Sequence, residues 1–137
     1  MVGSLSTGVR TIDIQHQELL QHVEAFESAH ALGDGLEAMQ VLLPQLEAYV
    51  LFHFDEEEHL MNSLANEAAF IQMHKAQHMG FITRLQDTKS RFLQHGDVAL
   101  ADQLVVFLRQ WLLHHIATTD VTLGAKWLAQ SSRRHKG

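Results

Sequence analysis

Apolar residues recur at intervals of three and four along most of the chain, which is the spacing of one face of an α-helix. Four such stretches are separated by short polar or glycine-containing segments. The pattern predicts an all-α fold, an up-down-up-down four-helix bundle with an N-terminal extended arm. We expect the arm at residues 1–10, the bundle at 11–130 and a basic C-terminal tail at 131–137.

Turn-forming residues mark the ends of the first two predicted helices. The first helix should begin near Thr11 and end at the turn 33–35, where two glycines flank an aspartate. The second should run over about 36–64. Pro44 lies inside it and lacks a backbone N–H, so we expect either a kink there or a late start of the regular helix.

The third and fourth helices are predicted to meet at Gly96. This glycine should end the third helix as a left-handed cap, and Asp97 should cap the helix that follows. The inner stripe of the fourth helix is expected to contain Leu104, Leu108, Trp111, Leu112, His115 and Thr118.

Composition narrows the class of protein. A chain of 137 residues that is 46% hydrophobic can bury one core, which indicates one domain. It has no cysteine, which excludes disulfides, thiolate nucleophiles and cysteine-ligated metals. The net charge of −6, with a compact basic run only near the end, argues against nucleic-acid binding. The chain has no stretch of about 18 consecutive apolar residues that could span a membrane, and its first ten residues lack the apolar region of a signal peptide, so we expect a cytoplasmic protein.

Five histidines and two acidic residues are predicted to face the interior, although a single such histidine is more often an ordinary core residue. Residues four apart share a helix face, so each of two pairs should converge on one point. Burying all seven groups without partners would be costly, whereas metal coordination satisfies them. Five imidazoles and two carboxylates exceed one tetrahedral zinc site and suit a pair of iron ions. The candidate ligands are His16, His53, Glu57, His74, His78, His115 and Asp120.

One spacing in this set is unusual. His115 and Asp120 are five residues apart, so on a regular α-helix their side chains differ in direction by about 140°. Either the helix widens locally to i→i+5 hydrogen bonding, or the two side chains straddle the metal pair from opposite flanks. We favour straddling, because a bridging carboxylate need not share the direction of the histidine.

Four motifs in order give the chain a family resemblance. HFDEEEHLM at 53–61 matches HFxxEExxM, IDIQH at 12–16 and HKAQH at 74–78 match two further helix motifs, and WLLHHIATTD at 111–120 matches WLxxHIxxxD. The chain thus resembles the hemerythrin family, including bacteriohemerythrins, over about residues 5–127. The resemblance implies a non-haem di-iron centre that binds dioxygen reversibly for transport, storage or delivery, and it implies a binding protein rather than an enzyme.

The resemblance also implies roles for individual residues. One iron would take the three histidines His74, His78 and His115, and the other would take His16 and His53. Glu57 and Asp120 would bridge the two ions together with an oxo or hydroxo group. The second iron would then have an open position for dioxygen, and Leu112, one turn before His115, is our candidate for the residue that shields it.

Two other functions remain open at this stage. The same domain could sense dioxygen or redox state for a fused or partner signalling domain. The sequence does not determine the oligomeric state. More remotely, Glu27/His30 and Glu56/His59 have the spacing used by ferritin-like di-iron oxidases. The remaining histidines, His22, His30, His59, His95, His114 and His135, are interpreted as surface residues or as neighbours of the ligands.

Overall fold

The structure, a computed structural model, describes residues 5–97 and 99–136, with side chains through Ser132. These residues are helical apart from short connections and include no strand, which confirms the predicted all-α class. The helices are α1 (Arg10–Ala31), α2 (Gly35–Glu37), α3 (Leu43–Asn62), α4 (Ala68–His95), α5 (Ala99–His115) and α6 (Val121–Lys136). Two π-helical turns, η2 (Ala38–Leu42) and η3 (Ile116–Asp120), join α2 to α3 and α5 to α6.

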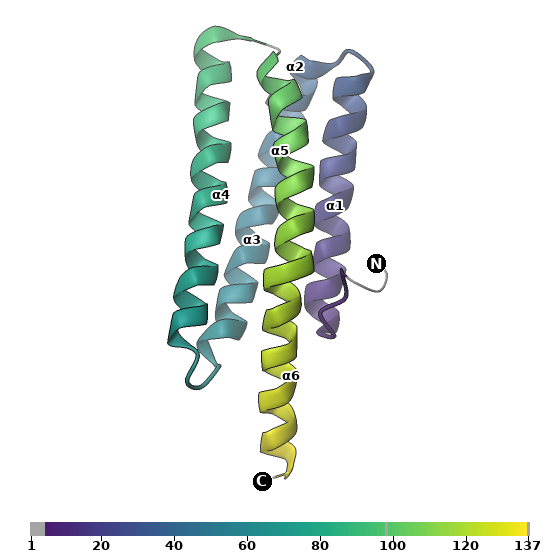
Figure 1. Ribbon diagram of the computed structural model, residues 1–137. Coiled ribbons are helices and arrows are strands. Elements are labelled where there is room, and N and C mark those ends of the chain that lie inside the picture. Colours follow the sequence, from purple (N-terminus) through teal and green to yellow (C-terminus); the bar gives the residue numbers. More distant parts are fainter. Residues whose placement is uncertain (1–4, 98, 137) are drawn as a thin grey trace.

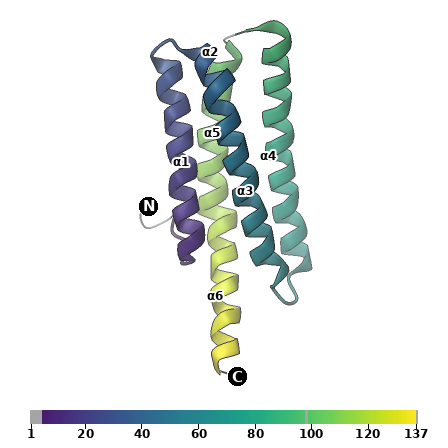
Figure 2. The ribbon, with the colours of Figure 1, turned by 180° about the vertical axis from the view of Figure 1, so that it is seen from behind.

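Four rods lie side by side in the predicted up-down-up-down bundle (Figures 1 and 2). The rods are α1, the α2–α3 segment, α4, and the α5–α6 segment. The last rod continues through η3, and α6 extends beyond the ends of the other three (Figure 1). Helix α6 includes residues 131–136, which were predicted to be a separate tail. No proline follows Val121, so every residue of this stretch has the backbone N–H that a helix needs.

The observed helix ends agree closely with those predicted. Pro44 lies in the first turn of α3, directly after the π-helical turn η2, so the regular α-helix starts late, which was one of the two predicted alternatives. Gly96 has the left-handed φ of 63° and donates its N–H to the Phe92 carbonyl at 2.7 Å. Asp97 accepts a hydrogen bond of 3.0 Å from the Ala99 N–H.

The core occupies the centre of the bundle, where the apolar faces of all four rods meet. Its largest fully buried side chains include Phe26, Phe81, Leu19, Leu43, Leu46, Leu85, Leu104, Leu108 and Leu112. A smaller apolar cluster, centred on Met61, Leu64 and Leu123, lies where α6 passes α3. Seven buried polar side chains lie along the helices between the residues of the two apolar clusters.

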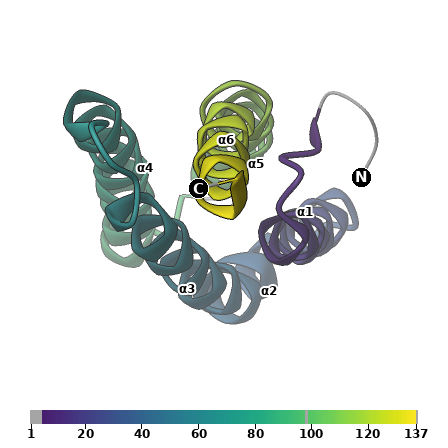
Figure 3. The ribbon, with the colours of Figure 1, turned by 90° about the horizontal axis from the view of Figure 1, so that it is seen from below.

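Thr7, in the described part of the N-terminal arm, contacts both α1 and α6, and Figure 3 shows this part of the chain beside α1. The Thr7 N–H and hydroxyl donate hydrogen bonds of 2.9 and 2.8 Å to Asp13 in α1. On the other side, the Thr7 carbonyl approaches Gly124 of α6 so closely that any side chain at Gly124 would overlap it. The sequence therefore needs glycine at this crossing point. Within the described ranges, no helix has the length and apolarity required to cross a membrane.

Candidate metal centre

The seven candidate ligands come from four rods and converge on one interior region. His16 is contributed by α1, His53 and Glu57 by α3, His74 and His78 by α4, and His115 and Asp120 by the α5–η3 segment. Each of these seven residues is no more than 3% exposed. Helical periodicity predicted the inward direction of the histidines and of Glu57, whereas Asp120 is buried although its five-residue spacing from His115 is off-phase on a regular helix.

Asp120 lies among three imidazoles. Its Oδ2 atom is 2.9 Å from His16 Nε2, and its Oδ1 atom is 3.0 Å from His74 Nε2 and 3.1 Å from His115 Nε2. Because the two oxygens face histidines of opposite rods, this carboxylate spans the region between them.

Glu57 spans the same region from α3. Its Oε1 atom is 3.3 Å from His53 Nε2 and 3.2 Å from His78 Nε2, and its Oε2 atom is 3.8 Å from His16 Nε2. Glu57 thus lies near histidines from three different rods.

The donor atoms form two overlapping groups. In one group, atoms from His74, His78, His115, Glu57 and Asp120 all lie within 4.8 Å of one another, and in the other the same holds for His16, His53, Glu57 and Asp120. The two groups share both carboxylates and no histidine. An arrangement of this kind offers two adjacent positions with three and two imidazoles, bridged by two carboxylates.

The prediction that His115 and Asp120 straddle the site across a regular helix was wrong. The backbone widens into the π-helical turn η3, which ends at Asp120, so the fifth residue after His115 comes back beneath it. Thr118, predicted on the inner stripe, is exposed, and Thr119, four residues after His115, is buried instead.

Three of the five imidazoles have a hydrogen-bond partner on the ring nitrogen that faces away from the centre. His53 Nδ1 is 2.8 Å from Gln15 Oε1, His78 Nδ1 is 3.0 Å from Glu58 Oε2, and His115 Nδ1 is 2.8 Å from Gln77 Oε1. Because these oxygens only accept, each Nδ1 carries the proton, which leaves the Nε2 lone pair free for a metal.

The sequence analysis did not identify Gln15, Glu58 or Gln77. A signal was present, since each is adjacent in sequence to a candidate ligand, but adjacency does not show which way a side chain turns. The hydrogen bonds of Gln15 and Gln77 each join residues 38 positions apart, a relation that only the assembled bundle reveals.

Unpartnered atoms show that the site is suited to cations. Ten buried donor or acceptor atoms of the cluster have no hydrogen-bond partner among the described residues, including both oxygens of Glu57 and both oxygens of Asp120. Nε2 is among them for His16, His74, His78 and His115. Buried polar atoms of native proteins nearly always have partners, and bound cations are one way to supply them.

The protonation of the cluster without metal follows from its burial. Burial raises the pKa of Glu57, and the nearby Asp120 carboxylate raises it further. Burial also opposes ionisation of Asp120, but the imidazoles of His115, His16 and His74 outweigh it, so the pKa of Asp120 lies well below its usual range. Glu57 therefore takes up a proton more readily than Asp120 when no cation is present.

Aromatic rings pack against the three-histidine side of the cluster. The Phe54 ring stacks on His78 with centroids 3.8 Å apart and planes 4° apart. The Trp111 ring stacks on His115 with centroids 4.5 Å apart and planes 14° apart. Together with the outer hydrogen bonds, these rings fix the orientation of the imidazoles.

Leu112, the residue predicted to shield dioxygen, is 1% exposed and belongs to the apolar core. His22 and His30 are half-buried, His59, His95 and His114 are exposed, and the side chain of His135 lies outside the described residues.

The residue pairs of the remote ferritin-like alternative do not join either donor group. Glu27 instead forms an ion pair with Arg109, with Oε1 2.6 Å from Nη2. Of the other pair, His59 is exposed.

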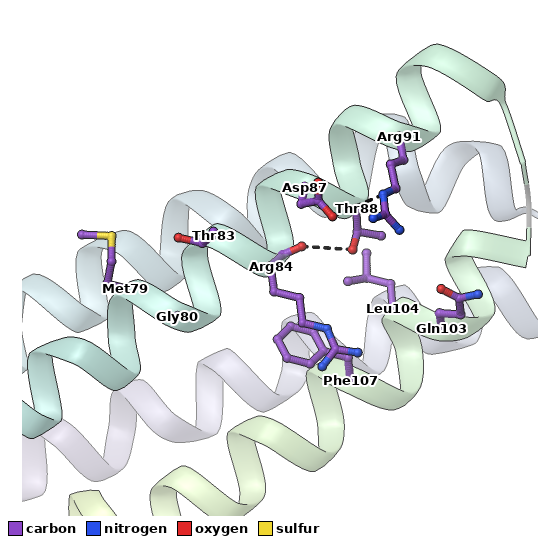
Figure 4. Close-up of a pocket in the computed structure, with 10 residues that line it drawn as sticks. All are labelled: Met79, Gly80, Thr83, Arg84, Asp87, Thr88, Arg91, Gln103, Leu104 and Phe107. Atoms are coloured by element: carbon purple, nitrogen blue, oxygen red, sulfur yellow. Dashed lines mark hydrogen bonds and ion pairs between the residues drawn. The ribbon is translucent and has the colours of Figure 1, made fainter.

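A surface cavity of about 610 Å³ lies apart from the cluster, between α4 and α5 (Figure 4). It is lined by residues such as Arg84, whose guanidinium lies 4.2 Å from the centroid of the Phe107 ring. None of the seven candidate ligands lines it. The candidate donors are buried inside the bundle, and the open cavity is a separate surface feature.

A four-helix bundle that encloses a shared cluster of histidines and carboxylates defines a helical metal-binding protein. Comparison with known proteins identifies the family. The model of the Hemerythrin HHE cation binding domain matches residues 7–127, and the chain therefore belongs to the hemerythrin family.

Relatives from several bacteria are similar over most of this chain. Bacteriohemerythrin of Pseudomonas paraeruginosa is 33% identical over 116 residues, which cover 85% of this chain and 72% of the relative. Bacteriohemerythrin of Methylococcus capsulatus is 28% identical over 122 residues, covering 89% and 90%. That of Clostridium acetobutylicum is 23% identical over 116 residues, covering 82% and 88%.

Proposed function

We propose that the protein binds dioxygen reversibly at two iron ions held by the seven buried donors. The observation that carries this proposal is the pair of donor groups that share Glu57 and Asp120 and have different histidines. Carboxylates placed between two imidazole sets suit two adjacent ions, and thiolate-free, imidazole-rich sites suit iron.

The unequal numbers of histidines support a division of roles. One ion would be held by His74, His78 and His115, and the other by His16 and His53, with both carboxylates shared. The second ion then has one protein ligand fewer, which leaves room for dioxygen on that ion. Iron, when bound, supplies the electrons that make dioxygen binding possible and takes them back on release.

The chain's own residues would keep the reaction at binding rather than catalysis. The cluster is buried and bordered by apolar and aromatic groups, which exclude water and the protons needed to reduce dioxygen further. We propose Leu112 as a residue that shields bound dioxygen, since it is buried and lies one turn before His115.

Iron content and oxygen binding test the proposal. Anaerobic reconstitution with ferrous iron should give two irons per chain and an absorption change that appears with dioxygen and disappears on its removal. Asp120→Asn should lower the iron content, because the amide cannot bridge as an anion. The exposed His95→Gln variant is the control and should retain two irons. One iron per chain, or a preference for zinc, would contradict the di-iron proposal.

A sensing role is the second candidate, and one observation favours it. The α5–η3–α6 segment forms one continuous rod that carries two candidate ligands and then extends beyond the bundle (Figure 1). A rod of this kind can transmit a change at the metal centre to a neighbouring domain. Oxidation-dependent change in the protease sensitivity of α6 would favour sensing, and identical cleavage in both states would favour a carrier.

A further inference from the structure

One threonine near the metal centre hydrogen-bonds differently from other helical threonines. Thr88, Thr118 and Thr122 each donate their hydroxyl to the carbonyl four residues earlier in their own rod, at 3.0, 2.7 and 2.8 Å. Figure 4 shows this bond for Thr88 and Arg84. Thr119 donates instead to Gln77 Oε1 on α4, at 2.8 Å, and is only 7% exposed.

The acceptor of this bond serves a second residue of the same rod. Gln77 Oε1 also accepts the Nδ1 proton of His115, at 2.8 Å. The amide nitrogen of Gln77 points the other way, toward Met73 Sδ at 2.9 Å, which fits an oxygen directed at the rod. A single carbonyl oxygen on α4 therefore contacts both the residue before η3 and the fourth residue within it.

Thr119 lies on the same face of the rod as His115 and Leu112, which precede it by four and seven residues. Its bond to Gln77 therefore ties the rod to α4 within η3, one residue before Asp120.

The same turn determines where Asp120 lies. Asp120 is the last residue of η3 and follows Thr119 directly. Whatever keeps η3 in the π form also keeps the Asp120 carboxylate beneath His115, where its Oδ1 is 3.1 Å from His115 Nε2.

We propose that Gln77 and Thr119 are positioning residues that hold His115 and η3 against α4, so that His115 and Asp120 are placed for metal binding. Neither residue belongs to either donor group. The inference rests on the proposed function in assuming that the seven donors bind metal, and it adds the means by which two of them are held.

Cobalt(II) titration of the metal-free protein tests the inference. Thr119→Val keeps the shape of the side chain and removes only the hydroxyl. It should weaken cobalt binding by about 10- to 100-fold, the usual effect of losing an outer partner of a ligand. Thr118→Val is the matched control on the exposed side of the same turn, and its affinity should stay within about twofold of wild type. The visible spectrum of bound cobalt should change for Thr119→Val and not for Thr118→Val.

Variants of Gln77 distinguish positioning from a general effect on folding. Gln77→Leu should weaken cobalt binding at least as much as Thr119→Val, and Gln77→Glu should restore it, because a carboxylate oxygen accepts both bonds. The double variant Gln77→Leu/Thr119→Val should bind like Gln77→Leu alone, since the shared oxygen is already lost. Circular dichroism of the metal-free proteins checks folding, and Thr119→Val decides the question if Gln77→Leu does not fold.

Two results would overturn the inference. One is equal cobalt affinity and spectrum for Thr119→Val and Thr118→Val, and the other is a double variant whose losses simply add. A wild-type protein that fails to bind two cobalt ions would instead contradict the proposed function. Wild-type binding of two ions with unaffected variants contradicts the positioning role alone.

Discussion

Removal of metal should make the stability of the protein depend strongly on pH. Burial lowers the pKa of His53 to about 3, with a further contribution from His16. Burial likewise lowers the pKa of His78 to about 2, with a further contribution from His74. In the unfolded chain both pKa values return to about 6.5. The unfolded state then binds more protons, so this contribution to stability is complete above pH 6.5 and is lost as pH falls toward the folded pKa.

Glu57 has the opposite effect. Its pKa is raised in the folded metal-free protein, chiefly by burial, so its contribution is complete below the unfolded value of 4.5 and is lost as pH rises above that value. If the unfolded and folded states differ by one bound proton, the free energy of unfolding changes by about 1.4 kcal/mol per pH unit.

These opposing contributions predict a characteristic curve. Between about pH 4.5 and 6.5, two imidazoles oppose one carboxyl, so stability should fall by about 1.4 kcal/mol for each pH unit of acidification. Below about pH 4.5 Glu57 is protonated in both the folded and the unfolded state and no longer affects the slope, which should double to about 2.7 kcal/mol per pH unit. Above about pH 6.5 the two imidazoles no longer affect the slope, so the metal-free protein should be most stable near that pH.

Urea denaturation of chelator-treated protein, followed by circular dichroism between about pH 4 and pH 8, measures this curve. His53→Gln removes one of the two imidazoles and should make stability nearly independent of pH between about pH 4.5 and 6.5. His95→Gln, at an exposed position, should keep the wild-type slope. Equal slopes for wild type and His53→Gln, or stability that increases on acidification from pH 6.5, would refute the reasoning.

Two further substitutions test the shielding of dioxygen and the attachment of the arm. Leu112→Ala should lower the free energy of unfolding by about 2–5 kcal/mol and should also accelerate autoxidation of the iron-loaded protein. Leu108 is equally buried, so Leu108→Ala should lower stability by a similar amount without accelerating autoxidation. Unchanged autoxidation in Leu112→Ala would exclude the shielding role. Gly124→Ala should destabilise the protein by about 1–3 kcal/mol because its methyl overlaps the Thr7 carbonyl. Gly80→Ala, where a methyl meets nothing, should instead stabilise α4 by about 0.5–1 kcal/mol, and thermal unfolding that ranks these variants otherwise would contradict this account.

Helical periodicity explains why the sequence predicted the fold and the burial of the donors. A helix face is defined by intervals of three and four residues, so His53 with Glu57 and His74 with His78 could be placed inward from spacing alone. Glycine and proline have strong backbone preferences, so Gly96 and Pro44 marked helix ends reliably.

The same periodicity could not predict where the helix departs from it. The five-residue interval from His115 to Asp120 fits either a π turn or a regular helix whose two side chains reach the metal pair from opposite sides. Which of the two backbone forms is more stable depends on contacts with other helices. Thr119 bonds to Gln77 on another rod, and nothing local in the sequence indicates that contact. The π turn at 38–42 was not predicted either, because its residues also occur in ordinary α-helices and do not mark a π turn.

The stacking of Trp111 on His115 gives the metal centre an optical readout. Because the indole and imidazole rings are nearly parallel, with centroids 4.5 Å apart, the excited indole is in van der Waals contact with a candidate ligand. The second tryptophan, Trp127, packs instead with the apolar cluster around Met61, Leu64 and Leu123. In a Trp127→Phe variant, all indole emission would come from Trp111. Its intensity would then follow metal loading at the three-histidine position directly, without any added dye.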